Sequence, residues 1–390
     1  MEEELDHAVL SPGFEPVAEA ARRQLAKAGG GALCVYVGGE PALDLWAGYR
    51  DPAAGSTWQP DTMAMAWSTA KGVASTALHM LADRGQLTYD DPVVRYWPEY
   101  GENGKRATTI RHLLSMEAGL YDIRHLIDDP RLMLDHEAMA DALAKATPAH
   151  RPGQRNGYHA FTYGWLIGEV VRRVTGVSLG SFVQSEMVVP LGLDGFHIGT
   201  PRAEHRRVAA LPSLPPLNPS ARLAGKAVNP LTTVFGISLH RYAAAFIPVD
   251  AHEVLRMPEF LEAEVPAVNG VFTARSLARF YAALGSDDGV DGVRLWSPET
   301  RRAAATEQND RRDRVISIRM RWRLGYHQPF PRKKASPDAF GFYGAFGSGA
   351  FADPSRNLAV GLTLQEARGL PLIKLMGPIV QAVDQTRRRR

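Results

Sequence analysis

Strand-like runs lie near the two ends of this 390-residue chain, and helical patterns fill the middle. Near the N-terminus, apolar runs at Ala32 to Val37 and Ala42 to Gly48 flank a Gly-Gly-Glu-Pro turn, which is the sequence form of a β-hairpin. Near the C-terminus, three further runs have strand character: Val315 to Tyr326, Ala339 to Ala352 and Leu358 to Leu364. Strands at both ends with helices between them predict one mixed α/β body (α+β) assembled from the two termini, with a helical domain inserted.

Helical periodicity is clear in several segments. Apolar residues recur at three- and four-residue spacing from about Phe14 to Ala28 and from Ser68 to Asp83. Further helices are predicted at Ile110 to Leu114, Glu137 to Lys145, Tyr163 to Val174, Leu179 to Val188, Ala274 to Leu284 and about Pro371 to Val383. The stretch from about Pro201 to Val265 is irregular and rich in proline, which indicates a functional loop region or a domain edge.

Charge and cysteine content exclude several classes of protein. The net charge is +3, and the Arg387 to Arg390 tail supplies four positive charges, so the rest of the chain is near neutral and shows no nucleic-acid footprint. We expect this tail to be a solvated end, with a basic surface anchor as the alternative. Cys34 is the only cysteine, which excludes an internal disulfide, and no Cys/His cluster has zinc spacing. We therefore expect no metal and no cofactor.

The N-terminal sequence bears on location. It reads Met-Glu-Glu-Glu-Leu-Asp, which is acidic where a signal peptide has basic residues followed by an apolar run. Nowhere do 18 apolar residues follow one another without interruption, as a membrane-spanning helix requires. We therefore expect a soluble cytoplasmic protein with no membrane association.

Ser68 and Lys71 open the second predicted helix, in the sequence Ser-Thr-Ala-Lys. Three-residue spacing places a hydroxyl and an amine on one helix face, which is the arrangement that a nucleophile and its base require. The same helix end offers the Ser68 N–H to a developing oxyanion. The motif alone is weak evidence, because a capping serine followed by a solvated lysine has the same spacing.

Several short segments give this motif a context. In chain order they are residues 68–71 (STAK), 87–93 (LTYDDPV), 109–120 (TIRHLLSMEAGL), 158–160 (YHA), 164–171 (GWLIGEVV) and 347–354 (GSGAFADP). This ordered set resembles the serine β-lactamase and penicillin-binding-protein superfamily, most closely its class C β-lactamases and family VIII carboxylesterases. The resemblance implies a β-lactamase-like fold with an antiparallel sheet flanked by helices. Its sheet domain would comprise residues 1–80 and 270–390, its helical domain 81–269, and its active site their interface.

Tyr158 matches the family's Tyr-x-Asn-like motif. The resemblance implies that it shares a proton with Lys71 and Ser68 and then protonates the leaving group. An adjacent ammonium is expected to lower the pKa of this tyrosine so that it can act as a base. Taken alone, Tyr158 is typical of a half-buried aromatic residue. Ala160 stands where many β-lactamases have Asn, so a side chain that could bond a β-lactam amide is missing.

The third family element is a Lys-Thr-Gly-like triplet on an edge strand, which we align with Phe342, Tyr343 and Gly344. The resemblance makes these three residues substrate-binding, and it makes the N–H groups of Ser68 and Ala345 the oxyanion hole. A glycine-rich bulged strand is the structural alternative. Phe342 replaces the cation that would hold a substrate carboxylate, so neutral acyl substrates are favoured.

Other residues near the motifs have weaker assignments. His159 is included as a candidate substrate contact because it follows Tyr158. We expect Trp322 and Tyr326 to pack within a strand. The proline-rich segment Leu211 to Leu231, with Phe235, could shape the acyl pocket.

These observations predict a serine carboxylesterase that acts on small or medium acyl esters through an acyl-Ser68 intermediate, with Lys71 and Tyr158 taking the hydroxyl proton. Three alternatives stay open: an acyltransferase that uses a metabolite alcohol or amine, a β-lactamase or D,D-peptidase, and a non-catalytic binding module. The expected partner is a small-molecule acyl ester.

Overall fold

The computed structural model describes residues 6–211, 239–246, 251–331, 333–367 and 369–389. The proline-rich segment and Phe235, expected to shape an acyl pocket, fall almost wholly within residues 212–238, outside the described residues.

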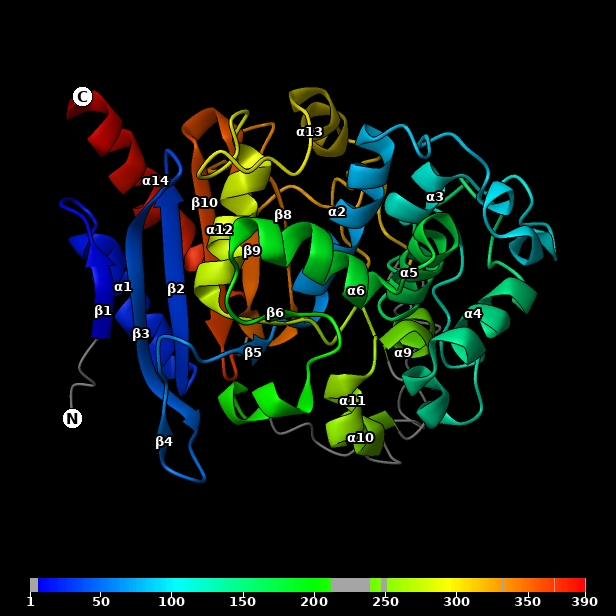
Figure 1. The fold of residues 1–390 in the computed structure, drawn as a ribbon, viewed down its shortest axis with the longest axis horizontal. Helices are drawn as coiled ribbons and strands as arrows, with labels where there is room; N and C mark the ends of the chain where they lie inside the picture. Colours follow the sequence, from blue (N-terminus) through cyan, green and yellow to red (C-terminus); the bar gives the residue numbers. More distant parts are fainter. Residues whose placement is uncertain (1–5, 212–238, 247–250, 332, 368, 390) are drawn as a thin grey trace.

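The main sheet has the strand order β1-β3-β2-β10-β9-β8, with β4 paired to β3, and all of its neighbouring strands are antiparallel. The strands are β1 (Asp6–Leu10), β2 (Gly30–Val37), β3 (Glu40–Asp51), β4 (Ser56–Thr57), β8 (Phe340–Tyr343), β9 (Gly349–Asp353) and β10 (Leu358–Leu364). The last strand, β10, lies beside the hairpin strand β2, with Leu358 opposite Val37. The predicted sheet built from both termini is therefore confirmed (Figure 1).

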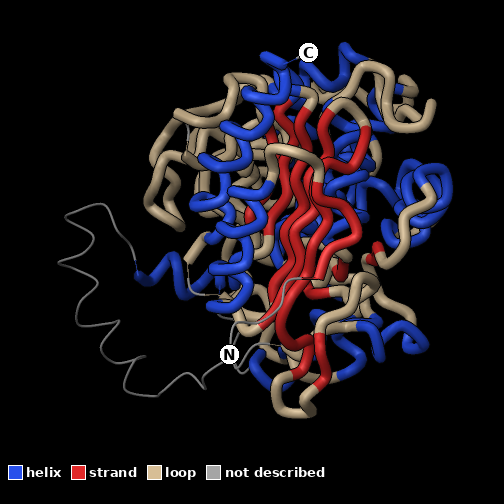
Figure 2. The backbone as a smooth tube through the Cα atoms, turned by 90° about the vertical axis from the view of Figure 1, so that its left-hand side faces the viewer, coloured by secondary structure: helices blue, strands red, loops and turns tan. Residues whose placement is uncertain are grey.

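Helices cover both faces of this sheet (Figure 2). Helices α1 (Glu15–Lys27) and α14 (Pro371–Arg389) pack on one face, and α12 (Ala274–Gly285) packs on the other. Alternate side chains of β2 enter two cores: Leu33 and Val35 join the core under α1 and α14, whereas Cys34 joins the larger core under α12. Because β2 is buried on both faces, its sequence is apolar without alternation.

The remaining helices form a mostly helical body beside the sheet (Figure 1). Its central helix, α2 (Ala70–Asp83), is buried from Ala70 through Leu81. The others are α3 (Ile110–Leu114), α4 (His136–Lys145), α5 (Thr162–Thr175), α6 (Leu179–Val183), α7 (Val189–Leu191), α9 (Leu239–Phe246), α10 (Ala251–Val254), α11 (Pro258–Glu262) and α13 (Pro298–Ala305). Short 3-10 turns are η1 (Trp67–Thr69), η2 (Val93–Arg95), η3 (Pro98–Gly101), η4 (Pro130–Leu134), η6 (Arg202–Arg207), η7 (Ala345–Gly347) and η8 (Pro354–Arg356), and η5 (Gln184–Val188) is a π-helical turn.

A second sheet of three short strands lies next to the start of α2. Its order is β5 (Ala64–Met65), β7 (Val271–Phe272) and β6 (Phe196–His197). This small sheet joins the segment before Ser68 to a segment two hundred residues later, and Gly270 accepts the Ala66 N–H. It therefore fixes the backbone that leads into α2.

One strand prediction is wrong. The run from Val315 to Tyr326 forms turns with isolated bridges, because Ser317 (φ 61°) and Arg321 (φ 54°) take left-handed backbone conformations that break an extended strand. The run from Ala339 to Ala352 is two strands, β8 and β9, separated by η7. None of the described helices is long and apolar enough to cross a membrane.

Candidate active site

Ser68 lies where the 3-10 turn η1 passes into α2. The residue before it, Trp67, has a positive φ of 51°, which is rare for a large side chain and indicates stored strain. Ser68 is partly exposed, whereas Lys71, one turn further along, is fully buried. The serine hydroxyl is thus reachable from outside and has a buried amine behind it.

The amine of Lys71 has three neighbours. Its Nζ lies 3.1 Å from Ser68 Oγ, and it donates to the carbonyl oxygens of Ala160 at 2.7 Å and Ala267 at 2.9 Å. Burial lowers the pKa of Lys71 well below its usual value, which favours the neutral amine. A neutral amine has two N–H groups and one lone pair. As an ammonium, Lys71 donates to Ser68 Oγ and to both carbonyls; as a neutral amine that donates to both carbonyls, it has its lone pair available to the Ser68 hydroxyl.

Tyr158 approaches Ser68 from the loop before α5. Its hydroxyl donates to Ser68 Oγ at 2.5 Å, and Lys71 Nζ lies 4.9 Å from the centre of its ring. Burial raises the pKa of Tyr158, which corrects the expectation that an adjacent ammonium lowers it. The phenol is therefore a proton donor in this arrangement, and Lys71 is the better proton acceptor.

Aromatic rings hold Tyr158 in place. The ring of Trp322 stacks on it at 5.7 Å and 6°, and Phe246 of α9 lies at 5.5 Å. The ring of Phe342 is 6.4 Å away. The prediction of strand packing for Trp322 misses this contact, because a pattern of apolar residues does not show which ring a tryptophan in a turn will meet.

The end of β8 lies against the backbone before Ser68. A Cβ on Gly344 would lie 2.1 Å from the carbonyl oxygen of Ala66, so only glycine permits this approach. The next residue, Ala345, is exposed at the start of η7. The structure therefore brings the third predicted motif beside the Ser68 motif.

The side chains of the aligned triplet point to opposite faces of the sheet. Phe342 faces Tyr158 and Trp322 in the larger core. Tyr343 lies in the core under α1 and α14, where its hydroxyl donates to the Phe330 carbonyl at 3.0 Å. Because successive strand residues alternate, the Tyr343 side chain is turned away from Ser68, contrary to its expected contact with substrate.

His159 does not join Ser68, Lys71 and Tyr158. It is buried, its Nε2 accepts the Leu120 N–H at 3.0 Å, and its ring packs edge-on against Tyr121. Burial lowers its pKa to about 3. Its surroundings are those of a structural histidine, and they correct the expectation that its side chain contacts substrate.

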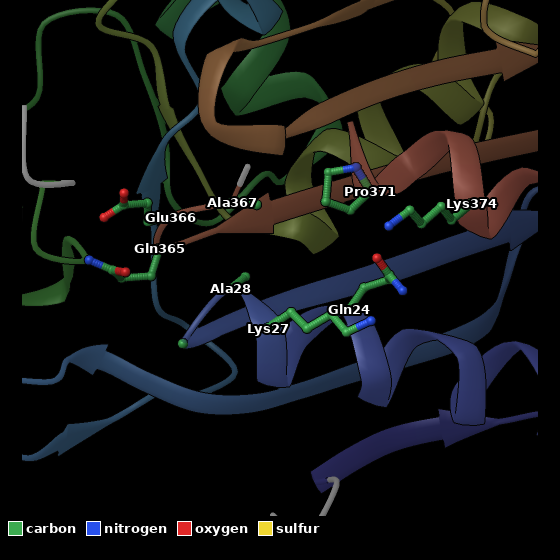
Figure 3. A pocket seen from close by; sticks show the side chains of 9 residues that line it. Gln24, Lys27, Ala28, Gln365, Glu366, Ala367, Pro371 and Lys374 are labelled. Atoms are coloured by element: carbon green, nitrogen blue, oxygen red, sulfur yellow. The ribbon is translucent and has the colours of Figure 1, made fainter. Parts of the chain in front are cut away.

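Other features that could bind ligands lie elsewhere or are absent from the described part of the chain. A cavity of about 390 Å³ lies between the end of α1 and the start of α14, and Figure 3 shows Gln24, Lys27, Gln365 and Lys374 around it. Its lining residues do not include Ser68, Lys71, Tyr158 or the aligned triplet Phe342, Tyr343 and Gly344. Within the described ranges no three His, Cys, Asp or Glu residues are placed to hold a metal ion.

Comparisons with known proteins identify the family of this chain. The Beta-lactamase family model matches residues 17–375. Esterase/beta-lactamase LipL of Mycobacterium tuberculosis is 36% identical over 86% of this chain and 76% of its own length. A crystal structure of a family VIII carboxylesterase has 30% identity and a TM-score of 0.85, covering 97% of this chain and all of the other.

A third similar structure is a penicillin-binding protein homologue from Caulobacter crescentus. It has 30% identity and a TM-score of 0.82, and it covers 97% of this chain and 100% of its own. The motif order, the fold and the Ser68 group agree with one superfamily. The chain belongs to the β-lactamase family and is a serine hydrolase of the serine β-lactamase and penicillin-binding-protein superfamily.

Proposed function

We propose that this protein is a carboxylesterase that transfers small or medium acyl groups from neutral esters to Ser68 and then to water. The observation that carries the proposal is the approach of two groups to one oxygen: Lys71 Nζ and the Tyr158 hydroxyl both lie within hydrogen-bonding distance of Ser68 Oγ.

In the acylation half, the neutral Lys71 amine takes the Ser68 proton as Oγ attacks the ester carbonyl. The tetrahedral intermediate then collapses, the bond to the leaving alkoxide breaks, and Tyr158 gives that alkoxide its proton. The phenolate recovers a proton from the Lys71 ammonium, which restores the neutral amine and the phenol. The products are acyl-Ser68 and a free alcohol. In deacylation, water replaces the alcohol and the same proton transfers run in reverse.

The developing oxyanion needs hydrogen-bond donors beside Ser68. The N–H groups of Ser68 and Ala345 fit this role, because Gly344 lets β8 approach Ala66 and the first N–H groups of a short helical turn have no acceptor inside the turn. These two donors come from different parts of the chain. Their separation therefore depends on the contact between β8 and η1.

The surroundings of Ser68 favour uncharged substrates. Phe342 occupies the position of the expected cation, is buried and packs on Tyr158, so it offers no charge to a substrate carboxylate. At position 160, Ala160 provides a backbone carbonyl to Lys71 and no side-chain amide. Both features disfavour substrates that are bound through a carboxylate or an amide.

Hydrolysis of β-lactams is the second candidate, because LipL carries both activities in its name. Phe342 and Ala160 predict that it is slower than ester hydrolysis. A location in the cytoplasm and transfer to alcohols or amines stay predictions.

The test compares the wild type with Ser68→Ala on p-nitrophenyl acetate, butyrate and octanoate. Ser75→Ala is the matched control, since Ser75 is a buried serine two helical turns along α2 whose hydroxyl donates to the Lys71 carbonyl. We expect Ser68→Ala to lose turnover by at least about 10⁴-fold and Ser75→Ala to keep most of it. Turnover retained in Ser68→Ala would refute the proposal. Addition of short alcohols or a chromogenic cephalosporin to the same assay measures the two other activities.

A further inference from the structure

Asp313 is a buried carboxylate beside the proposed active site. It is 1% exposed and lies in the turn-rich segment between α13 and β8. Its Oδ1 accepts the Tyr158 N–H at 3.0 Å, and its Oδ2 accepts the Trp322 indole N–H at 3.1 Å. The N–H groups of Val315 and Ile316 also bond Oδ1, at 2.8 and 3.1 Å.

These contacts connect Asp313 to Tyr158 in two ways. One carboxylate oxygen holds the Tyr158 backbone, and the other holds the indole that stacks on the Tyr158 ring at 5.7 Å and 6°. The position of a side chain is fixed when both its backbone and its ring plane are fixed. We propose that Asp313 is the positioning residue that aims the Tyr158 hydroxyl at Ser68 and at the leaving group. This inference rests on the proposed role of Tyr158 as proton donor.

The negative charge of Asp313 also helps to keep the Tyr158 hydroxyl protonated. A carboxylate near a phenol disfavours the phenolate. Burial is the main cause of the raised pKa of Tyr158 and Asp313 adds to it, whereas the hydrogen bond to Ser68 lowers this pKa. Among the described residues, the other titratable groups that interact with Tyr158 are Lys71, Tyr163 and Tyr242. Four neutral N–H donors stabilise the carboxylate itself, while burial raises its pKa.

The leaving group provides a readout that a purely structural role would not change. A p-nitrophenyl ester leaves as a stable phenolate and needs no proton, whereas the ethyl ester of the same acid must be protonated by Tyr158. Both esters give the same acyl-Ser68, so the leaving group affects only acylation, which kcat/KM reports. We expect Tyr158→Phe to reduce kcat/KM much more on the ethyl ester than on the p-nitrophenyl ester. Asp313→Asn should show the same preference in kcat/KM: a loss of roughly 10- to 100-fold on the ethyl ester and only a few-fold on the p-nitrophenyl ester.

Two further variants keep the inference falsifiable. Trp322→Phe keeps an aromatic ring beside Tyr158 but removes the indole N–H and makes the stacked ring smaller. It should therefore give the same leaving-group preference to a smaller extent, even if Asp313→Asn does not fold. The matched control is Asp353→Asn at the far end of β9. Asp353 is also buried and accepts from Ser336, Ser355 and Arg356, so this change should lower stability and affect both esters equally.

The outcomes separate the two proposals. If Tyr158→Phe shows the leaving-group preference while folded Asp313→Asn and Trp322→Phe do not, Asp313 is a structural residue and the proposed function stands. If Tyr158→Phe shows no such preference, the proton-donor role fails and the inference about Asp313 fails with it. A preference shared by Tyr158→Phe, Asp313→Asn and Trp322→Phe, and absent from Asp353→Asn, supports the inference.

Discussion

Trp67 and Phe346 both have left-handed backbone conformations, and their rings lie 4.9 Å apart. One directly precedes Ser68 and the other directly follows Ala345, so the two strained residues flank the proposed oxyanion donors. Left-handed backbone costs a non-glycine residue about 1–2 kcal/mol. The ring contact holds both segments in this conformation, and it links the backbone at one donor to the backbone at the other.

Substitutions at Phe346 test this strain. Both Phe346→Ala and Phe346→Gly remove the ring contact, but only glycine takes a φ of 57° without cost. We therefore expect Phe346→Gly to be more stable than Phe346→Ala by about 1 kcal/mol, the reverse of the usual order. Urea unfolding of the two variants measures the difference. Equal stability, or a more stable alanine variant, would show that position 346 is not strained.

Gly344 provides a test of the contact between β8 and η1. In Gly344→Ala, the new Cβ would meet the Ala66 carbonyl at 2.1 Å, and because that neighbour is backbone it cannot rotate away. The end of β8 must then shift and move the Ala345 N–H, so we expect kcat on p-nitrophenyl esters to fall by about 10²- to 10³-fold. Gly377→Ala in α14 is the control, since its Cβ meets nothing within 4 Å. Full activity in folded Gly344→Ala would contradict the oxyanion assignment.

The pH dependence of kcat/KM reports the ionisation of Lys71. The proposed mechanism needs the neutral amine, so kcat/KM should rise as pH increases through the pKa of Lys71 and stay constant above it. Burial lowers that pKa well below its usual value, so the plateau should begin well below about pH 10.4. A profile from about pH 5 to 10, with Ser68→Ala as the blank for spontaneous hydrolysis, measures this rise. A rise centred on the ordinary lysine pKa would contradict the role of Lys71 as base.

Two buried histidines, His79 and His159, should make the folded protein less stable at acidic pH. Burial lowers the pKa of His79 to about 4 and that of His159 to about 3, from a usual value of 6.5. Between the folded-state pKa of each histidine and 6.5, the unfolded chain binds more protons than the folded chain. The stability that the two neutral histidines contribute is therefore fully present above pH 6.5 and is lost as pH falls toward their folded-state pKa values. Each histidine should cost about 1.4 kcal/mol per pH unit in that range. In urea unfolding at several pH values, the slope for His159→Gln should be smaller than that of the wild type by about 1.4 kcal/mol per pH unit, and an unchanged slope would contradict the prediction.

The sequence predicts the sheet and the Ser68–Lys71 pair well, because each rests on local patterns. The β2–β3 hairpin is predicted by alternation and a turn, and the buried helix α2 is predicted by its spacing of apolar residues. The same kind of pattern wrongly predicts a strand from Val315 to Tyr326, between α13 and β8. There Asp313 binds backbone N–H groups of Val315 and Ile316, and left-handed residues replace the predicted strand.

The parts of the site that sequence reasoning misses are made by backbone or by distant contacts. The carbonyls of Ala160 and Ala267 hold Lys71, but any residue carries a carbonyl, so no residue type marks them. The sequence predicts substrate contact for Tyr343 as a member of the third motif and for His159 as the neighbour of Tyr158. The side chain of one faces the opposite side of the sheet, and that of the other bonds Leu120 in the core.

The mass of the protein during turnover tests directly whether Ser68 is the nucleophile. Wild type is mixed with p-nitrophenyl butyrate, quenched in acid within the first turnovers and analysed as intact protein and as peptides. We expect a mass increase equal to one butyryl group on the peptide that contains Ser68, and no increase in Ser68→Ala. A butyryl group on another residue, or ester turnover in wild type that Ser68→Ala retains, would contradict the central claim that Ser68 carries the acyl group.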